Sequence, residues 1–92
     1  MNIYYAYKAD LIANVLDGIS CLECISKNRR YKLKDSNYML VIVYTDRGTI
    51  VSPFSGKGND LSIVSWEDFM SNIPEEAATE LLFNLDVLRK YS

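Results

Sequence analysis

The chain has 92 residues, of which 49% are hydrophobic and 24% charged. These proportions indicate one small folded domain over residues 1–92 and argue against a disordered tail or a fibrous repeat. Ten Lys and Arg residues against twelve Asp and Glu residues give a net charge of −2, so the chain as a whole is not a basic nucleic-acid binder. It also contains no histidine, which removes the commonest general base and metal ligand.

The N-terminus carries no positive segment followed by an apolar one, so no secretory signal is legible there. The longest apolar run, residues 39–44, is far shorter than the ~20 residues that a membrane helix needs. We therefore expect a cytoplasmic protein that makes no contact with a membrane.

Apolar residues at helical spacing predict an N-terminal helix over residues 8–16, with Leu11, Ile12, Val15 and Leu16 on one face. Gly18 leaves two alternatives: it ends this helix as a C-terminal cap, or the helix continues to about residue 27. Residues 19–26 fit helix or strand, and we favour helix.

Residues 31–34 alternate between polar and apolar, which predicts a short edge strand followed by a turn over residues 35–37. Residues 38–45 give the clearest strand, and their almost continuous apolar run predicts that it is covered on both faces. A tight turn containing Gly48 leads into a returning strand over residues 49–52, which Pro53 is expected to end. Residues 55–60 lack the spacing of a phosphate-binding loop and indicate a flexible connection.

Ser65 is the predicted N-cap of a helix whose apolar face carries Trp66, Phe69, Met70 and Ile73. Pro74 is the predicted first residue of a second helix, with Ala77, Ala78, Leu81, Leu82, Leu85 and Leu88 pointing inward. The predicted fold is α+β in two layers: an N-terminal helix, an antiparallel β-hairpin or three-strand meander, and two C-terminal helices.

Cys21 and Cys24 are the only cysteines. A tetrahedral zinc site needs four ligands, and a redox Cys-x-x-Cys motif needs its first thiol at a helix N-terminus. We interpret the pair as structural or incidental and expect neither metal nor cofactor. The alternatives are a redox pair and a metal ion shared across a homodimer.

Charge is distributed unevenly along the chain. Residues 24–34 contain five cations and no carboxylate: Lys27, Arg29, Arg30, Lys32 and Lys34. Residues 58–86 contain seven carboxylates and no cation: Asp60, Glu67, Asp68, Glu75, Glu76, Glu80 and Asp86. The acidic stretch fits a solvated helix face or a surface that attracts a basic partner. The basic stretch allows nucleic-acid binding, with Tyr31 or Tyr38 stacking on bases.

The C-terminal third resembles the closing helices of small bacterial immunity proteins from contact-dependent inhibition and related polymorphic toxin systems. The resemblance lies in the segments Ser65-Trp66-Glu67-Asp68-Phe69, Ile73-Pro74-Glu75-Glu76 and Leu82-Phe83-Asn84-Leu85-Asp86. It implies a cytoplasmic protein that blocks a nuclease-type toxin by tight, non-covalent binding.

We therefore predict a non-enzymatic inhibitor with an acidic, aromatic-containing surface that binds a basic toxin or nuclease domain. The tyrosines clustered at the N-terminus are included because tyrosine is enriched at interfaces, although packing at the core edge explains them equally well. The predicted contact residues are Asp60, Glu67, Asp68, Glu75, Glu76, Glu80, Tyr4, Tyr5 and Tyr7. The alternatives are a phage-encoded inhibitor of a host defence protein and a small nucleic-acid-binding regulator that uses residues 27–34. Whether the chain forms a homodimer is left open.

Overall fold

The computed structural model describes residues 4–6, 9–26 and 29–89. Within them, six strands form one antiparallel sheet in the order β1-β5-β4-β3-β2, with β6 also paired to β5. The strands are β1 (Tyr4–Ala6), β2 (Leu22–Ser26), β3 (Arg30–Leu33), β4 (Tyr38–Thr45), β5 (Gly48–Lys57) and β6 (Asp60–Ile63). The helices are α1 (Ala9–Asp17), α2 (Trp66–Ser71) and α3 (Glu75–Arg89).

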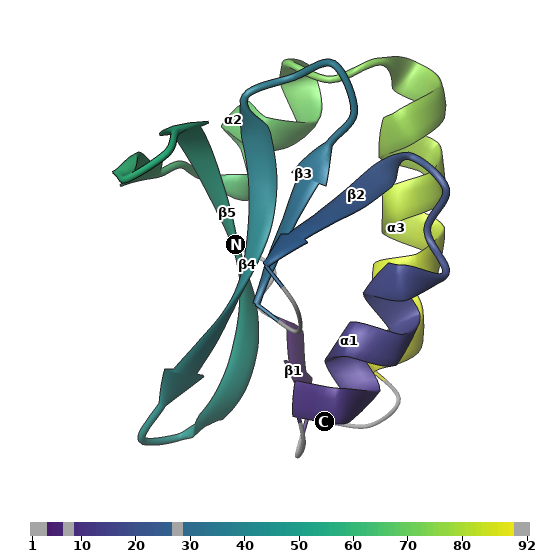
Figure 1. Cartoon of the computed structure of the whole chain (residues 1–92). Helices are drawn as coiled ribbons and strands as arrows, with labels where there is room; N and C mark the ends of the chain where they lie inside the picture. The colour runs from purple at the N-terminus through teal and green to yellow at the C-terminus, as the bar shows by residue number, and fades with distance from the viewer. Residues whose placement is uncertain (1–3, 7–8, 27–28, 90–92) are drawn as a thin grey trace.

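Helices α1 and α3 lie side by side against one face of the strongly twisted sheet (Figure 1). Helix α2 extends this layer, because its Phe69 ring packs edge-on against Tyr38 of β4 with the ring centroids 5.7 Å apart. The predicted two-layer α+β class is confirmed. The sheet has more strands than the predicted hairpin or meander, because the segments around residues 5, 24 and 61 also pair into it.

The core lies between the helices and the covered sheet face. From the sheet it takes Leu40 and Ile42 of β4 and Val51 of β5, and from α3 the inward residues Leu81 and Leu85. The remaining members are Ile12, Ala13, Leu16, Ile19, Leu22, Tyr31, Leu33, Trp66, Phe69, Ile73, Ala77 and Leu88. Burying one large apolar side chain contributes about 1.5–3 kcal/mol, so this cluster is the main source of stability.

Residues 22–26 form a strand, so our preference for helix over residues 19–26 was wrong. Helix α1 ends at Asp17, where the Gly18 N–H donates to the Val15 carbonyl at 3.1 Å. Strand β2 then pairs with β3, which makes β3 an internal strand where an edge strand was predicted. The burial pattern of β2 does not alternate as in a typical strand, because its first residue is buried and the other four are exposed. Pairing with β3 decides its conformation, and tertiary context often overrides local preference in this way.

Pro53 lies inside β5, so the prediction that it ends the strand was also wrong. Its carbonyl accepts a hydrogen bond from the Val64 N–H at 3.1 Å on the side of β5 away from β4. In an antiparallel strand the N–H and C=O of one residue point the same way, so the missing proline N–H faces this outer side. No bond to β4 is lost. On this outer side, residues 49–51 of β5 pair with β1 and residues 54–57 pair with β6. Pro53 lies between the two paired segments.

The segment over residues 55–60 is part of the β5–β6 hairpin, not a flexible connection. Gly56 has φ = 142°, and a Cβ at this position would overlap the Asp60 carbonyl oxygen. The chain therefore needs glycine there, since no other residue tolerates both this backbone angle and this close approach. The tight turn before Gly48 (φ = 129°) and the Ser65 N-cap, whose Oγ accepts from the Asp68 N–H at 3.0 Å, are confirmed.

The second face of the sheet is not covered by any helix that the structure describes. Residues paired across strands share a face, so the registers place these residues together on it: Glu23, Arg30, Lys32, Met39, Val41, Val43, Ile50, Ser52, Phe54, Leu61 and Ile63. We call this set the open sheet face. Met39 is buried, but most of the apolar members are half-buried and Ile63 is exposed. Residues 38–45 were predicted to be covered on both faces; among the described elements, helices cover them on the α1–α3 side only.

Candidate functional site

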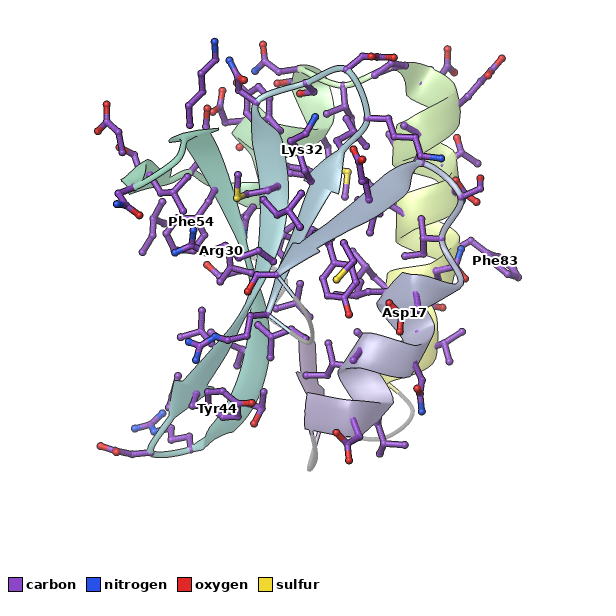
Figure 2. All side chains as sticks on the ribbon, in the orientation of Figure 1. Asp17, Arg30, Lys32, Tyr44, Phe54 and Phe83 are labelled. Atoms are coloured by element: carbon purple, nitrogen blue, oxygen red, sulfur yellow. The ribbon has the colours of Figure 1, made fainter. Side chains whose placement is uncertain are left out.

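The outward side of α3 carries two large apolar residues. A helix turns about 100° per residue, so Phe83 lies about 200° around the axis from the fully buried Leu81. Phe83 is 75% exposed and its neighbour Leu82 is 47% exposed. Figure 2 shows Phe83 projecting away from the sheet. Leu82 was predicted to point inward, which was wrong because Leu81 and Leu85 already fill that side.

Carboxylates surround these two residues. Glu75 and Glu76 occupy the first turn of α3, where the helix dipole favours negative charge, and both are exposed. We call the exposed residues Glu75, Glu76, Thr79, Leu82, Phe83 and Asp86 the α3 outer surface. The charged members of this set, Glu75, Glu76 and Asp86, are all carboxylates, and its centre is apolar. Lys34 lines a cavity that Glu76 also lines.

The other predicted carboxylates are placed on two further elements. Glu67 and Asp68 lie exposed in the first turn of α2, where Asp68 also accepts a hydrogen bond from the Asn72 amide at 2.9 Å. Three residues separate α2 from α3 along the chain, so the two acidic first turns follow one another closely. Asp60 begins β6, paired with Lys57 in the β5–β6 hairpin.

Glu80 is engaged inside the molecule. Its carboxylate accepts hydrogen bonds from the Ser20 N–H (3.0 Å), the Ser20 hydroxyl (2.7 Å) and the Cys21 N–H (3.2 Å). These bonds, chiefly those from Ser20, lower the pKa of Glu80 below its ordinary value of 4.5. Glu80 therefore fastens the α1–β2 connection to α3. Local sequence holds no signal of this role, because the partners are about 60 residues away along the chain.

A cavity of about 300 Å³ opens beside this junction, lined by Ser20, Cys21, Leu33, Lys34, Pro74, Glu76, Ala77 and Glu80. Burial raises the pKa of the Cys21 thiol to about 11, and a hydrogen bond to Glu80 adds to the effect. The thiol is thus protonated at neutral pH, whereas nucleophilic and metal-binding cysteines react as thiolates. Over the described ranges, no three Cys, Asp or Glu residues are grouped so that they could hold a metal ion.

The alternative function, nucleic-acid binding, relied on the cations of residues 27–34 and on Tyr31 or Tyr38, and the structure does not bring the described members of this set together on one surface. Tyr31 is only 1% exposed in the core, so it cannot stack on a base, and Tyr38 is half-buried against Phe69. Burial also raises the pKa of Tyr31, whose hydroxyl lies near Asp17 without a well-formed hydrogen bond in the described structure. Among the cations, Arg30 and Lys32 lie on the open sheet face, Arg29 stacks over Tyr44 at 5.5 Å and Lys34 lines the cavity. Lys27 lies outside the described residues.

The N-terminal tyrosines are placed only by their backbone. Tyr4 and Tyr5 belong to β1 and are register partners of Val51 and Ile50 in β5. Their side chains, and Tyr7 as a whole, lie outside the described residues. Their predicted contact with a partner stays a prediction.

No helix in the described part of the chain is long and apolar enough to cross a membrane. Comparison with family models, curated proteins and solved structures finds no match to this chain, so its function is inferred from its own residues.

Proposed function

We propose that the protein is a non-catalytic inhibitor that binds a basic, nuclease-type toxin domain through the α3 outer surface. The inhibitor role is the one that its resemblance to immunity proteins implies. The proposal places it in the cytoplasm. One observation carries it: Phe83 and Leu82 are exposed at the centre of a surface whose charged residues are all carboxylates. A solvated helix face needs carboxylates, but it does not need an exposed phenylalanine.

The two kinds of side chain have different roles in such an interface. The carboxylates Glu75 and Glu76 stand where the phosphates of a nuclease substrate would lie, and they speed the encounter with a basic surface. Phe83 supplies the desolvated anchor, because buried aromatic residues dominate the energy of many interfaces. Inhibition then follows from occupying the partner's substrate site, and no bond is made or broken.

The first turn of α2 extends the proposed surface. Glu67 and Asp68 add two exposed carboxylates on the helix that precedes α3. Glu80 is left out of the proposed contact set, because its carboxylate already accepts hydrogen bonds from Ser20 and Cys21. A charge reversal at Glu80 would therefore test folding and not binding.

The test uses purified basic nuclease domains of polymorphic toxins, including any encoded beside this chain's gene, in a nucleic-acid cleavage assay. We expect stoichiometric inhibition of a matching domain by the native protein. Phe83→Ser should weaken binding about 30-fold or more, as for a central anchor. Glu76→Lys should slow association about tenfold and flatten its dependence on salt.

Asp46→Lys is the matched control for charge, because Asp46 is also exposed but lies in the β4–β5 turn. It should leave association almost unchanged. The proposal is wrong if none of the nuclease domains is bound, or if Phe83→Ser and Glu76→Lys inhibit as well as the native protein does.

A further inference from the structure

The cavity beside the α1–β2 connection is held open by hydrogen bonds between elements. The Lys34 N–H, just after β3, donates to the Cys21 carbonyl at 3.0 Å. Glu80 of α3 accepts from Ser20 and from the Cys21 N–H. Figure 1 shows the α1–β2 connection passing alongside α3. These bonds join three segments that are distant along the chain, so the shape of the cavity is fixed by the fold.

Two uncompensated charges of opposite sign line this cavity. Glu76 precedes Glu80 by four residues, so the two carboxylates lie on the same side of α3. The Glu80 carboxylate is already engaged by Ser20 and Cys21. Within the described residues, no hydrogen bond or ion pair engages the Glu76 carboxylate or the Lys34 ammonium group. The cavity therefore offers one cation and one anion, whose charges sum to zero.

The rest of the lining is largely apolar. Leu33 and Ala77 are buried, and together with Pro74 they supply the hydrophobic part of the wall. The volume of about 300 Å³ lies at the lower end of the range of small-molecule sites, roughly 300–1,000 Å³. Such sites commonly combine an apolar wall with a few charged groups that orient the ligand. A matching ligand is small, carries one positive and one negative group, and has an apolar remainder.

We infer that the cavity binds a small apolar α-amino acid, such as leucine, in its zwitterionic form. The carboxylate of the ligand lies against the Lys34 ammonium group, its ammonium group against Glu76, and its aliphatic side chain against Leu33 and Ala77. A simple anion would leave Glu76 unpaired, and a simple cation would leave Lys34 unpaired. The site goes beyond the proposed inhibition and does not depend on a toxin.

The test is a titration of the protein alone with L-leucine, followed by heteronuclear NMR spectroscopy and isothermal titration calorimetry. Leucine should shift the backbone amide signals of Ser20, Lys34 and Ala77 and leave those of the β4–β5 turn unchanged. Isoamylamine lacks the carboxylate of leucine, and isocaproate lacks its ammonium group. Each should bind at least about tenfold more weakly than leucine, because one charge-assisted contact is lost.

Two variants remove the charges of the cavity separately. Lys34→Met and Glu76→Gln should each weaken leucine binding at least about tenfold. Both side chains are exposed, so circular dichroism and urea unfolding should match the native protein. Glu75→Gln is the matched control for the carboxylate, because Glu75 is the neighbouring exposed glutamate and does not line the cavity. Lys57→Met, at the end of β5, is the control for the cation, and both controls should bind leucine as the native protein does.

The inference is overturned if leucine at tens of millimolar leaves the amide signals of the cavity unchanged. It is also overturned if isoamylamine or isocaproate binds as tightly as leucine, which would indicate a site for a single charge, or if Glu75→Gln weakens binding as much as Glu76→Gln. Lys34→Met separates this site from the proposed function, because it should weaken leucine binding and still inhibit the toxin.

Discussion

The two sides of α3 carry equally apolar residues in very different surroundings. Leu81 and Leu85 are fully buried against α1 and the sheet, while the adjacent Leu82 and Phe83 are exposed. Glu76 and Glu80 repeat the contrast, because one carboxylate faces solvent and the other accepts hydrogen bonds from Ser20 and Cys21. Residue type alone therefore does not mark the core of this helix. Its inward side stabilises the fold, and its outward side carries the exposed residues of the α3 outer surface.

The largest expected effect comes from truncating one leucine to alanine on each side of α3. Leu85→Ala should lower the free energy of unfolding by about 2–5 kcal/mol, because it leaves a cavity in the core. Leu82→Ala should lower it by less than about 1 kcal/mol. Urea unfolding of both variants measures the difference. Equal losses would show that the two sides of α3 are not distinct.

The reactivity of Cys21 tests the junction that Glu80 holds. A pKa near 11, against an ordinary value of 9.0, reduces the thiolate population at pH 8 on the order of 100-fold. Alkylation by iodoacetamide in a Cys24→Ser background should therefore be that much slower in the folded protein than in urea. Mass spectrometry follows the reaction. Similar rates in the two states would mean that the thiol is neither buried nor held against Glu80.

The two carboxylates should differ in their contribution to stability. Glu80→Gln loses charge-assisted hydrogen bonds from Ser20 and Cys21 and should cost about 1–2 kcal/mol. Glu76→Gln changes an exposed group and should stay within about 0.5 kcal/mol of the native protein. Chemical denaturation at neutral pH compares them. If Glu76→Gln were as costly as Glu80→Gln, the proposed fastening role would be wrong.

The smallest expected effect is the pH dependence of this Glu80 contribution. Its pKa in the folded protein lies below 4.5, so on acidification the unfolded chain takes up a proton first. The contribution is therefore complete above the unfolded pKa and is lost as pH falls through the folded pKa. The stability gap between native protein and Glu80→Gln should be constant near neutral pH and shrink below about pH 4.5. A gap that widens on acidification would contradict this assignment.

Local patterns in the sequence predicted several features correctly. The helix spacing after Pro74, the Ser65 cap and the turn before Gly48 all act within a few residues, so they can be predicted without knowledge of the fold. The helix itself begins at Glu75, one residue after the predicted Pro74. Helix periodicity also predicts the outward direction of Phe83, because it lies about 200° around the helix axis from Leu81 and cannot face the same side. Phe83 was not among the predicted contact residues, which were carboxylates and N-terminal tyrosines.

Other features depended on contacts between distant segments. Strand β2 has no strand-like alternation and becomes a strand by pairing with β3. Pro53 is accepted within β5 because its missing N–H faces the outer side, which the sequence does not reveal. The bonds between Glu80 and Ser20 join residues about 60 positions apart, so no local pattern predicts them.

By itself, the amino-acid order determined the apolar spacing of the helices, the Ser65 cap, the turn before Gly48, how charge divides along the chain, and that β4 has two apolar sides. Only the tertiary structure decided which of those sides the helices cover, which glutamate on α3 is occupied, and that the uncovered cations and the exposed Phe83 end on opposite sides of the molecule. The physical reason is range: helix periodicity, capping and backbone angles operate over one or two turns, whereas burial and hydrogen bonding between segments depend on how the whole chain packs.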